Sequence, residues 1–258
     1  MPLMKTSNPA LGDNTFRNVG GGGYGYGALD ATARMTLNGT VNKTGILLIC
    51  VFATAAFTWY SFVSTGNQAA AGGLMTIGLI GGFITALVTV FKKEWSPVTA
   101  PLYALLEGLA LGGISAMINA RYPGIAMEAV GITFGVLFAL LLAYSARIIK
   151  VTRKFALGIF AATGGIMLFY LAQMLLGFFH IPLLASVNGN GTIGIGFSLF
   201  VAAIAALNLV LDFDFIERGV NLGAPKYMEW YGAFGIMVTL VWLYLEILRL
   251  LTKMRSRD

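Results

Sequence analysis

The sequence is poor in the residues on which soluble proteins and metalloenzymes depend. It has one cysteine, Cys50, and one histidine, and only 11% of its 258 residues are charged. A soluble globular domain has about 25% charged residues, so this chain has too few to cover a surface in contact with water. A lone cysteine excludes an intrachain disulfide and a zinc site with several cysteine ligands. Cys50 lies within an apolar run, where a small hydrophobic residue is expected.

Apolar residues take the place of the missing charges. Hydrophobic residues make up 57% of the chain, whereas a soluble domain has about 45–50%. This excess is too large for a single buried core and indicates an outer surface that faces lipid. The 33 glycines agree with this interpretation, because glycine is more frequent in membrane helices than in soluble ones.

Several apolar runs have the length of a membrane span, which is about 20 residues. Backbone polar groups in hydrocarbon must be satisfied within the segment, so each run should be helical. The sequence therefore predicts an all-α membrane protein with seven transmembrane helices, at residues 45–64, 70–91, 99–120, 126–147, 155–179, 192–212 and 231–251.

Three regions follow from this pattern. Residues 1–40 are polar and glycine-rich, and such a stretch buries too little apolar surface to offset its ordering entropy. We expect a flexible cytoplasmic tail there, no signal peptide, and a transmembrane domain over residues 41–252. Residues 253–258 form a basic C-terminal tail. The glycine run at residues 20–27 lacks the Gly-Lys-Ser/Thr ending of a phosphate loop, so no nucleotide site is expected.

Basic residues between the runs predict the orientation. They cluster in the N-terminal tail and in alternate connections, at Lys5, Arg17, Arg34, Lys43, Lys92, Lys93, Arg147, Lys150, Arg153, Lys154, Arg218 and Lys226. The positive-inside rule then places the N-terminus in the cytoplasm, in the inner or plasma membrane of the cell. Basic residues in cytoplasmic loops also account for the net charge of +6. The charge therefore does not indicate nucleic-acid binding, and we expect no nucleic-acid partner.

The C-terminal end conflicts with this topology. Seven spans put the C-terminus outside, yet the chain ends with four basic residues, Arg249, Lys253, Arg255 and Arg257. Two alternatives remain at this point. Either the early helices dominate the orientation, or the last segment is re-entrant and the chain has six spans.

Ionisable residues within the runs are candidates for function, because they are costly in a membrane. Glu107, Asp212, Asp214 and Glu246 are the acidic candidates, with Asn208 and Arg249 beside them. Asn208 and Asp212 are four residues apart and share a helix face, whereas Asp212 and Asp214 point in different directions. Glu246 and Arg249 are three residues apart and can pair. For Glu107, Asp212 and Glu246 the alternative is a paired polar group that fixes helix packing. For Asp214 and Arg249 the alternative is an interfacial charge that reaches the lipid headgroups.

Carboxylates that meet in a dry helix bundle must share protons, recruit a basic partner or bind a cation. Calcium prefers oxygen ligands, so these residues suit an ion path or a pH sensor. An enzyme is not expected, because His180 has no recognisable catalytic partner and Asp212 and Asp214 share one helix. We expect no cofactor and no resident metal, with Ca²⁺ only as a permeant ion.

Three stretches resemble one known family. Residues 206–217 (ALNLVLDFDFIE), 242–251 (WLYLEILRLL) and 107–113 (EGLALGG) are similar to the sixth, last and third helices of the Bax inhibitor-1 family. These proteins are also called YccA-like or transmembrane Bax-inhibitor-motif proteins. Two longer stretches, residues 93–108 and 223–233, resemble a bacterial branch of this family.

The resemblance implies a fold with six helices around a central seventh. It also implies a proton-sensitive calcium leak, gated by an aspartate pair between the sixth and seventh helices. Asp212 matches the first position of the pair and Glu246 the second, where the family has aspartate. The link between the two is longer here. The expected function is thus a pH-sensitive calcium or cation leak, or ion homeostasis, with lipid, calcium ions and protons as partners. The alternative is a non-conducting regulatory protein that binds a membrane protease or another membrane partner.

Overall fold

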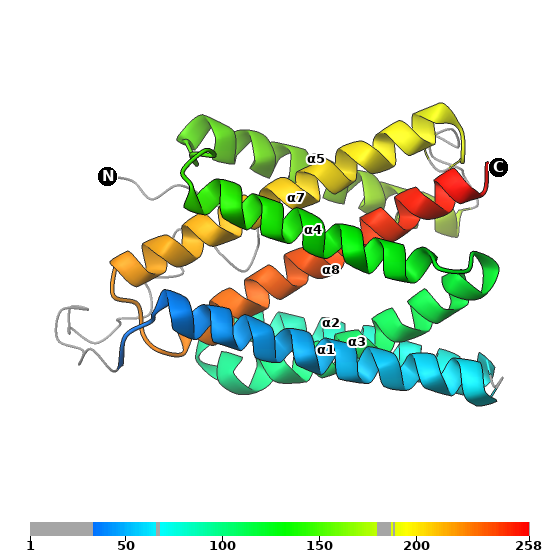
Figure 1. Ribbon diagram of the computed structural model, residues 1–258, viewed down its shortest axis with the longest axis horizontal. Coiled ribbons are helices and arrows are strands. Elements are labelled where there is room, and N and C mark those ends of the chain that lie inside the picture. The colour runs from blue at the N-terminus through cyan, green and yellow to red at the C-terminus, as the bar shows by residue number, and fades with distance from the viewer. Residues whose placement is uncertain (1–32, 66–67, 180–186, 188, 258) are drawn as a thin grey trace. The chain divides into compact units, whose positions relative to one another are not determined.

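The computed structural model describes residues 33–65, 68–179, 187 and 189–257, and the regular secondary structure of these residues is helical (Figure 1). A short 3-10 helix, η4 (Lys93–Trp95), precedes α3. The long helices are α1 (Leu37–Thr65), α2 (Gln68–Phe91), α3 (Ser96–Arg121), α4 (Ile125–Ser145), α5 (Arg153–Phe178), α7 (Thr192–Asn221) and α8 (Met228–Arg255).

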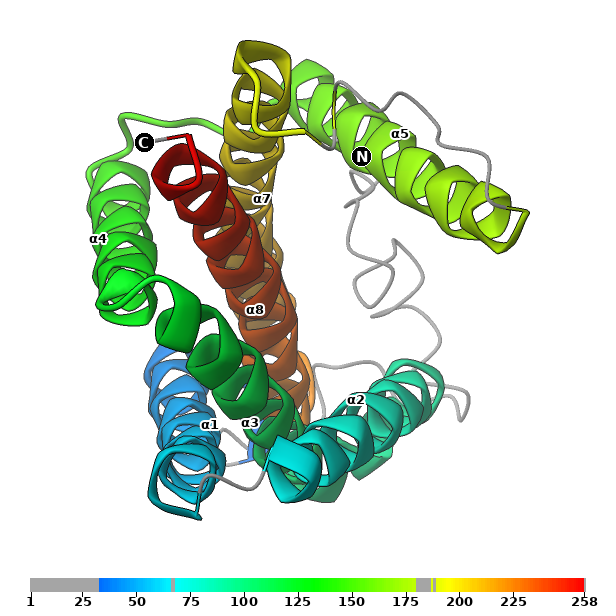
Figure 2. The same ribbon diagram turned by 90° about the vertical axis from the view of Figure 1, so that its right-hand side faces the viewer.

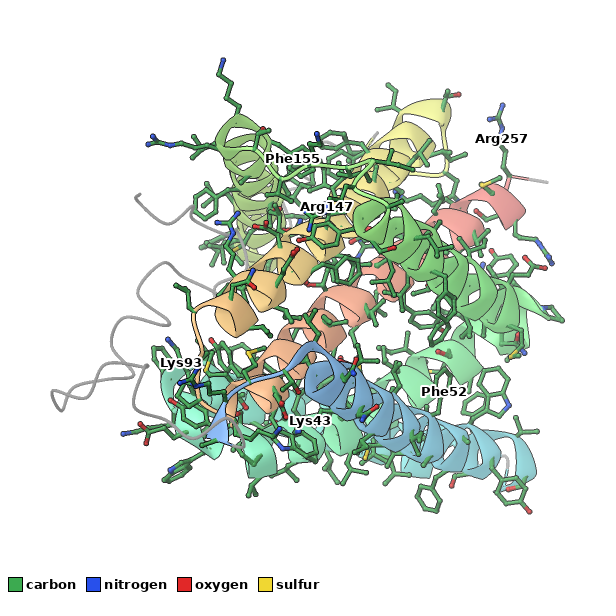
Figure 3. All side chains as sticks on the ribbon, turned by 60° about the vertical axis from the view of Figure 1, so that its left-hand side comes forward. Lys43, Phe52, Lys93, Arg147, Phe155 and Arg257 are labelled. Atoms are coloured by element: carbon green, nitrogen blue, oxygen red, sulfur yellow. The ribbon has the colours of Figure 1, made fainter. Side chains whose placement is uncertain are left out.

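These seven long helices are each long and apolar enough to cross a membrane. The chain is therefore an all-α membrane protein, as predicted. The helices present many large apolar side chains on their outer faces, such as Ile49, Phe83 and Phe138, as lipid contact requires. Charged side chains such as Lys93, Arg147 and Arg257 lie just beyond helix ends (Figure 3). The expected arrangement of six helices around the seventh stays a prediction.

Helix boundaries differ from the predicted ones at both ends of the chain. α1 begins at Leu37, within the region predicted as a tail, whereas residues 1–32 of that tail lie outside the described residues. α8 runs without interruption from Met228 to Arg255, so the last segment is a helix of spanning length and not a re-entrant loop. The predicted basic tail beginning at residue 253 is therefore wrong in its boundary, because Lys253 and Arg255 belong to α8.

Local sequence accounts for where several helices start and stop. Thr152 precedes α5 in an extended conformation, and its hydroxyl accepts a hydrogen bond from the Phe155 N–H at 3.2 Å, as a helix N-cap does. α7 ends before Gly223, whose φ of 68° lies in the left-handed region that favours glycine. The next residues make the turn into α8.

The described residues form two compact units, which share α7 and α8. The first unit contains α4, α5, the part of α7 up to Phe213 and the part of α8 from Thr239 onward. The second contains α1, α2, α3, the end of α7 from Asp214 and the beginning of α8 up to Val238.

In the second unit, α3 packs against both α1 and α2 (Figure 2). Two glycines of α3 allow the backbones to approach closely. A Cβ atom on Gly108 would lie 2.9 Å from Cα of Val51, and one on Gly112 would lie 2.7 Å from Cα of Ala55. Small residues at a helix interface are a usual basis for helix association in membranes, since they bring backbones into van der Waals contact.

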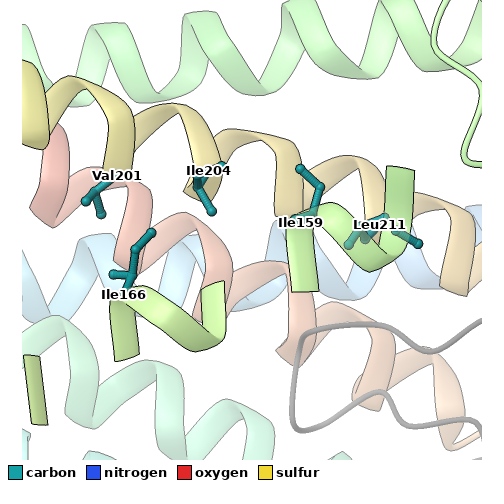
Figure 4. Close-up of a cluster of buried hydrophobic side chains, with 6 residues drawn as sticks. Ile159, Ile166, Val201, Ile204 and Leu211 are labelled. Atoms are coloured by element: carbon teal, nitrogen blue, oxygen red, sulfur yellow. The ribbon is translucent and has the colours of Figure 1, made fainter. Parts of the chain in front are cut away.

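In the first unit, α5 and α7 meet through a buried apolar cluster (Figure 4). Its members are Ala156, Ile159 and Ile166 from α5, and Val201, Ile204 and Leu211 from α7. On α7 these residues follow the spacing of one helix face, on which Asn208 also falls. The cluster therefore fixes the orientation of α7 and determines where its polar residues lie.

The close approach of α1 and α3 predicts a large difference between two similar substitutions. Gly112→Ala should cost roughly 1–3 kcal/mol, because the added methyl group would overlap the Ala55 backbone. Gly135→Ala in α4 is the control, since a Cβ atom there would meet nothing within 4 Å. It should leave stability unchanged or raise it by up to about 1 kcal/mol. Unfolding of the purified protein in mild detergent measures both, and equal effects would contradict the proposed contact.

Candidate functional site

Asp212 lies in the seam between α7 and α8 in the first unit. The residue is fully buried, with 0% of its surface exposed. Its Oδ2 atom accepts a hydrogen bond from the Thr239 hydroxyl of α8 at 2.6 Å. A short bond of this kind to a carboxylate is typical of a charge-assisted hydrogen bond. Asp212 thus connects the two helices directly.

Asn208 lies one turn earlier on α7 and is also buried. Its amide nitrogen donates to the Thr163 hydroxyl of α5 at 2.9 Å and to the Ile204 carbonyl at 2.8 Å. Both residues are buried, which agrees with the shared helix face that their four-residue spacing predicted. They bind different neighbours, however, so that α7 makes polar contacts with α5 through one residue and with α8 through the other.

Glu246 on α8 forms a second polar group, which we call the Tyr170–Glu246–Arg249 cluster. The Glu246 residue is 2% exposed. Its carboxylate accepts hydrogen bonds from the Tyr170 hydroxyl at 3.1 Å and from Arg249 Nη1 at 3.1 and 3.2 Å. Arg249 Nη1 also donates to the Tyr170 hydroxyl at 2.5 Å, and its guanidinium lies 5.1 Å from the centre of the Tyr170 ring. The three-residue spacing of Glu246 and Arg249 had predicted that these two residues can pair.

Asp212 and Glu246 accept hydrogen bonds from different residues. The hydrogen-bond partners of Glu246 are Tyr170 and Arg249, while Asp212 meets Thr239. Thr239 and Glu246 are seven residues apart on α8, or about 10 Å along the helix axis. The acidic pair that the resemblance implied stays a prediction.

Two other predicted residues belong to the second unit. Asp214 forms an ion pair with Arg218, one turn later on α7, which agrees with the prediction that it points away from Asp212. Glu107 of α3 faces Gly82 of α2, where an added Cβ atom would lie 2.9 Å from its Oε2 atom. Both carboxyl groups therefore belong to the second unit.

The sequence analysis overlooked the most heavily bonded carboxylate of the second unit. Glu229 is 0% exposed and accepts hydrogen bonds from the Thr36 N–H at 2.9 Å and the Thr36 hydroxyl at 2.8 Å. It also pairs with Lys43 and with Lys226. Glu229 therefore joins the start of α1 to the start of α8. It lies two residues before the apolar run predicted at residues 231–251, outside the runs in which candidate residues were sought.

Three neutral residues of the site were also overlooked. Thr163, Tyr170 and Thr239 each bond a candidate residue, but none carries a charge that would single it out within an apolar run. The one available signal was spacing, because Thr239 lies seven residues before Glu246 and hence on the same side of the helix.

The first-unit site defines a class of protein: a multi-pass helical membrane protein with one carboxylate buried between α7 and α8 and another buried between α5 and α8. A family model described as Bax inhibitor 1 like matches residues 6–256 of the chain. The chain therefore belongs to the Bax inhibitor-1-like family, as its motifs indicated. No curated protein and no solved structure matches it.

The bond between Thr239 and Asp212 can be tested by two substitutions at one position. Thr239→Val keeps the shape of the side chain but removes the hydroxyl donor, which should cost about 1–3 kcal/mol because a buried acceptor loses a partner. Thr239→Ser retains a hydroxyl and should cost less. Detergent unfolding curves of the two variants give the comparison. If valine is tolerated as well as serine, the hydrogen bond does not hold α7 to α8.

Proposed function

We propose that the chain is a pH-sensitive cation leak protein of ion homeostasis, with calcium as the permeant ion, and that it is not an enzyme. Membership of the Bax inhibitor-1-like family supports the class. The observation that carries the proposal is the complete burial of Asp212 between two helices of spanning length. A carboxyl group there has a high energetic cost, and this cost is usually tolerated where the group has a function.

Asp212 is suited to sense pH because its two protonation states make different contacts. As a carboxylate it accepts the hydrogen bond of the Thr239 hydroxyl. As a neutral acid it can donate, and it no longer attracts a cation. Since charges interact strongly in an apolar seam, gain of one proton changes the energy of a nearby cation far more than it would in water. Proton binding at Asp212 thereby controls cation entry between α7 and α8.

The other polar residues of the first unit supply a path for the ion. The side-chain oxygens of Asn208 and Thr163 lie at the α5–α7 contact, and the carboxylate of Glu246 lies further along α8. Hard cations such as Ca²⁺ bind oxygen atoms of this kind. In this scheme Asp212 is the pH sensor, and Glu246 is an ion-binding position regulated by Arg249.

Calcium flux into proteoliposomes at two pH values tests the proposal. The wild-type protein should conduct calcium at a rate that depends on pH. Asp212→Asn should lose this dependence and keep, at both pH values, the rate that the wild type shows at the lower pH, because the amide imitates the neutral acid. Glu128→Gln is a matched control at a carboxylate that pairs with Arg255 away from this seam, and it should behave like the wild type. A wild-type flux that is absent, or that neither pH nor the substitution alters, would exclude the proposed leak.

A non-conducting regulatory protein that binds a membrane protease or another membrane partner is the second candidate. One observation favours it: the buried carboxylates of Asp212 and Glu246 are already bonded, the first to Thr239 and the second to Arg249. Bonded carboxylates of this type can fix helix packing without any ion passing. Absence of flux from well-folded wild-type protein would favour this function.

We propose that the chain resides in the inner or plasma membrane with its N-terminus in the cytoplasm. The positive-inside rule supports this orientation, since basic residues gather in the connections after α2, α4 and α7. With seven spans, the α4–α5 connection and the end of α8 face opposite sides of the membrane.

Cysteine labelling tests this topology. In a Cys50→Ser background, Arg257→Cys should react with a membrane-impermeant maleimide in intact cells. Lys150→Cys, in the α4–α5 connection, should react only after permeabilisation. The reverse pattern would invert the orientation, and labelling of both positions on the same side would contradict seven spans.

A further inference from the structure

Lysine side chains from two separate elements stack on the first turn of α8. Lys43 Nζ of α1 lies 5.5 Å from the centre of the Trp230 ring, and Lys93 Nζ of η4 lies 5.8 Å from the centre of the Tyr231 ring. Both lysines belong to the second unit and are labelled in Figure 3. A third lysine, Lys226, precedes the helix by two residues. The beginning of α8 therefore gathers positive charge from different parts of the chain.

These lysines differ in how their charge is neutralised. Lys43 and Lys226 both form ion pairs with the buried carboxylate of Glu229. Lys93 is partly buried, yet no carboxylate of the described residues forms an ion pair with it. Its ammonium group lies over the Tyr231 ring, which attracts a cation but carries no opposite charge. Lys93 thus keeps a positive charge that an anion from outside the chain can neutralise.

Tyr231 holds Lys93 at a fixed place. The tyrosine is 0% exposed, and its ring centre lies 6.3 Å from that of Phe234. Its buried hydroxyl group has no hydrogen-bond partner among the residues that the structure describes, so two donors at this point lack an acceptor. The Ser96 hydroxyl donates to the Tyr227 carbonyl at 3.0 Å and ties the beginning of α3 to the turn before α8. Because the surroundings of Lys93 are already held, an anion that binds there requires little further ordering of the protein.

The surface beside Lys93 combines positive charge with large apolar side chains. Lys92 is exposed, and the aromatic residues on either side of the two lysines, Phe91 and Trp95, are 78% and 60% exposed. Glu94 is the one acidic residue between α2 and α3. Aromatic and basic residues together are typical of the depth at which lipid headgroups meet acyl chains. The combination fits an amphiphile with an anionic headgroup, whereas a free anion would use the lysines alone.

We propose that Lys93 and Lys92 bind the phosphate group of an anionic phospholipid, while Phe91 and Trp95 contact its acyl chains. Tyr231 is a positioning residue, which acts through Lys93. Lysine is a usual binder of phosphate, and basic pockets between membrane helices are sites for lipid headgroups. In the proposed orientation this end of the second unit faces the cytoplasmic leaflet, which contains anionic lipid. The proposal goes beyond the ion path, since it concerns other residues and requires no ion to pass.

Native mass spectrometry of the purified full-length protein in mild detergent tests the site. The probes are dioleoylphosphatidylglycerol, which is anionic, and dioleoylphosphatidylcholine, which has a phosphate group but no net charge. The wild type should bind phosphatidylglycerol at least about fivefold more tightly than phosphatidylcholine. Lys93→Gln should lose about fivefold in affinity for phosphatidylglycerol, because a basic residue near anionic lipid contributes about 1 kcal/mol, which corresponds to this factor.

Matched variants show which property of the site matters. Lys93→Arg keeps the positive charge and should keep the affinity. Lys226→Gln removes a lysine from the same end of the second unit, but one that is already paired with Glu229, and it should leave the affinity unchanged. Trp95→Ala should weaken binding of the dioleoyl lipid more than binding of its short-chain dihexanoyl analogue, because the lost contact is with the acyl chains.

Lysine acetylation of the wild-type protein locates the site without any substitution. Phosphatidylglycerol should slow the acetylation of Lys93 and leave that of Lys226, whose side chain is 50% exposed, unchanged. Equal protection of the two lysines, equal loss of affinity in Lys93→Gln and Lys226→Gln, or equal affinity of the wild type for both lipids would show only a general attraction and overturn the proposal. Displacement of the lipid by inorganic phosphate at equal concentration would also overturn it, because the site would then take a free anion. None of these results depends on flux.

Discussion

The organisation of this protein depends on one constraint: a carboxyl group inside a bundle of apolar helices must have polar partners. Transfer of an unpaired charge out of water is costly, and membrane lipid provides no compensation. Among the residues that the structure describes, three acidic side chains are almost completely buried, and each meets this constraint differently. Asp212 has a neutral hydroxyl, Glu246 has an arginine and a tyrosine, and Glu229 has two lysines and a threonine. The three residues are almost equally buried, so they differ in the chemistry of their partners and not in their exposure.

A neutral partner leaves a carboxyl group free to change its charge, whereas a basic partner fixes it. Thr239 can donate to a carboxylate or accept from an acid, so Asp212 stays bonded in both protonation states. The lysines around Glu229 hold it in the charged form and make it a structural link between the beginnings of α1 and α8. Glu246 is intermediate, since its basic partner lies on the exposed side and is attached by one helical turn.

The helices could be predicted from the sequence because bilayer thickness determines the length of an apolar span, and composition reveals it. Local spacing also sufficed for Asn208 with Asp212 and for Glu246 with Arg249. What could not be predicted was the register of α8 against α7. That register depends on the turn at Gly223 and on the point at which α8 begins, and it decides that Asp212 meets Thr239. Neutral partners such as Thr163 and Tyr170 give no signal in an apolar sequence, since their role depends on which helices touch.

The distance between Thr239 and Glu246 also has an electrical consequence. The two residues are about 10 Å apart along α8, which is roughly a third of the hydrocarbon thickness of a bilayer. Charges at the levels of Asp212 and Glu246 therefore lie at different positions in the field of a polarised membrane. Moving one elementary charge between these levels changes its energy by about 0.8 kcal/mol per 100 mV, a third of the full transmembrane value. Separation of the two acidic residues by two helical turns thus makes the energy difference of a charge between their two levels dependent on membrane voltage.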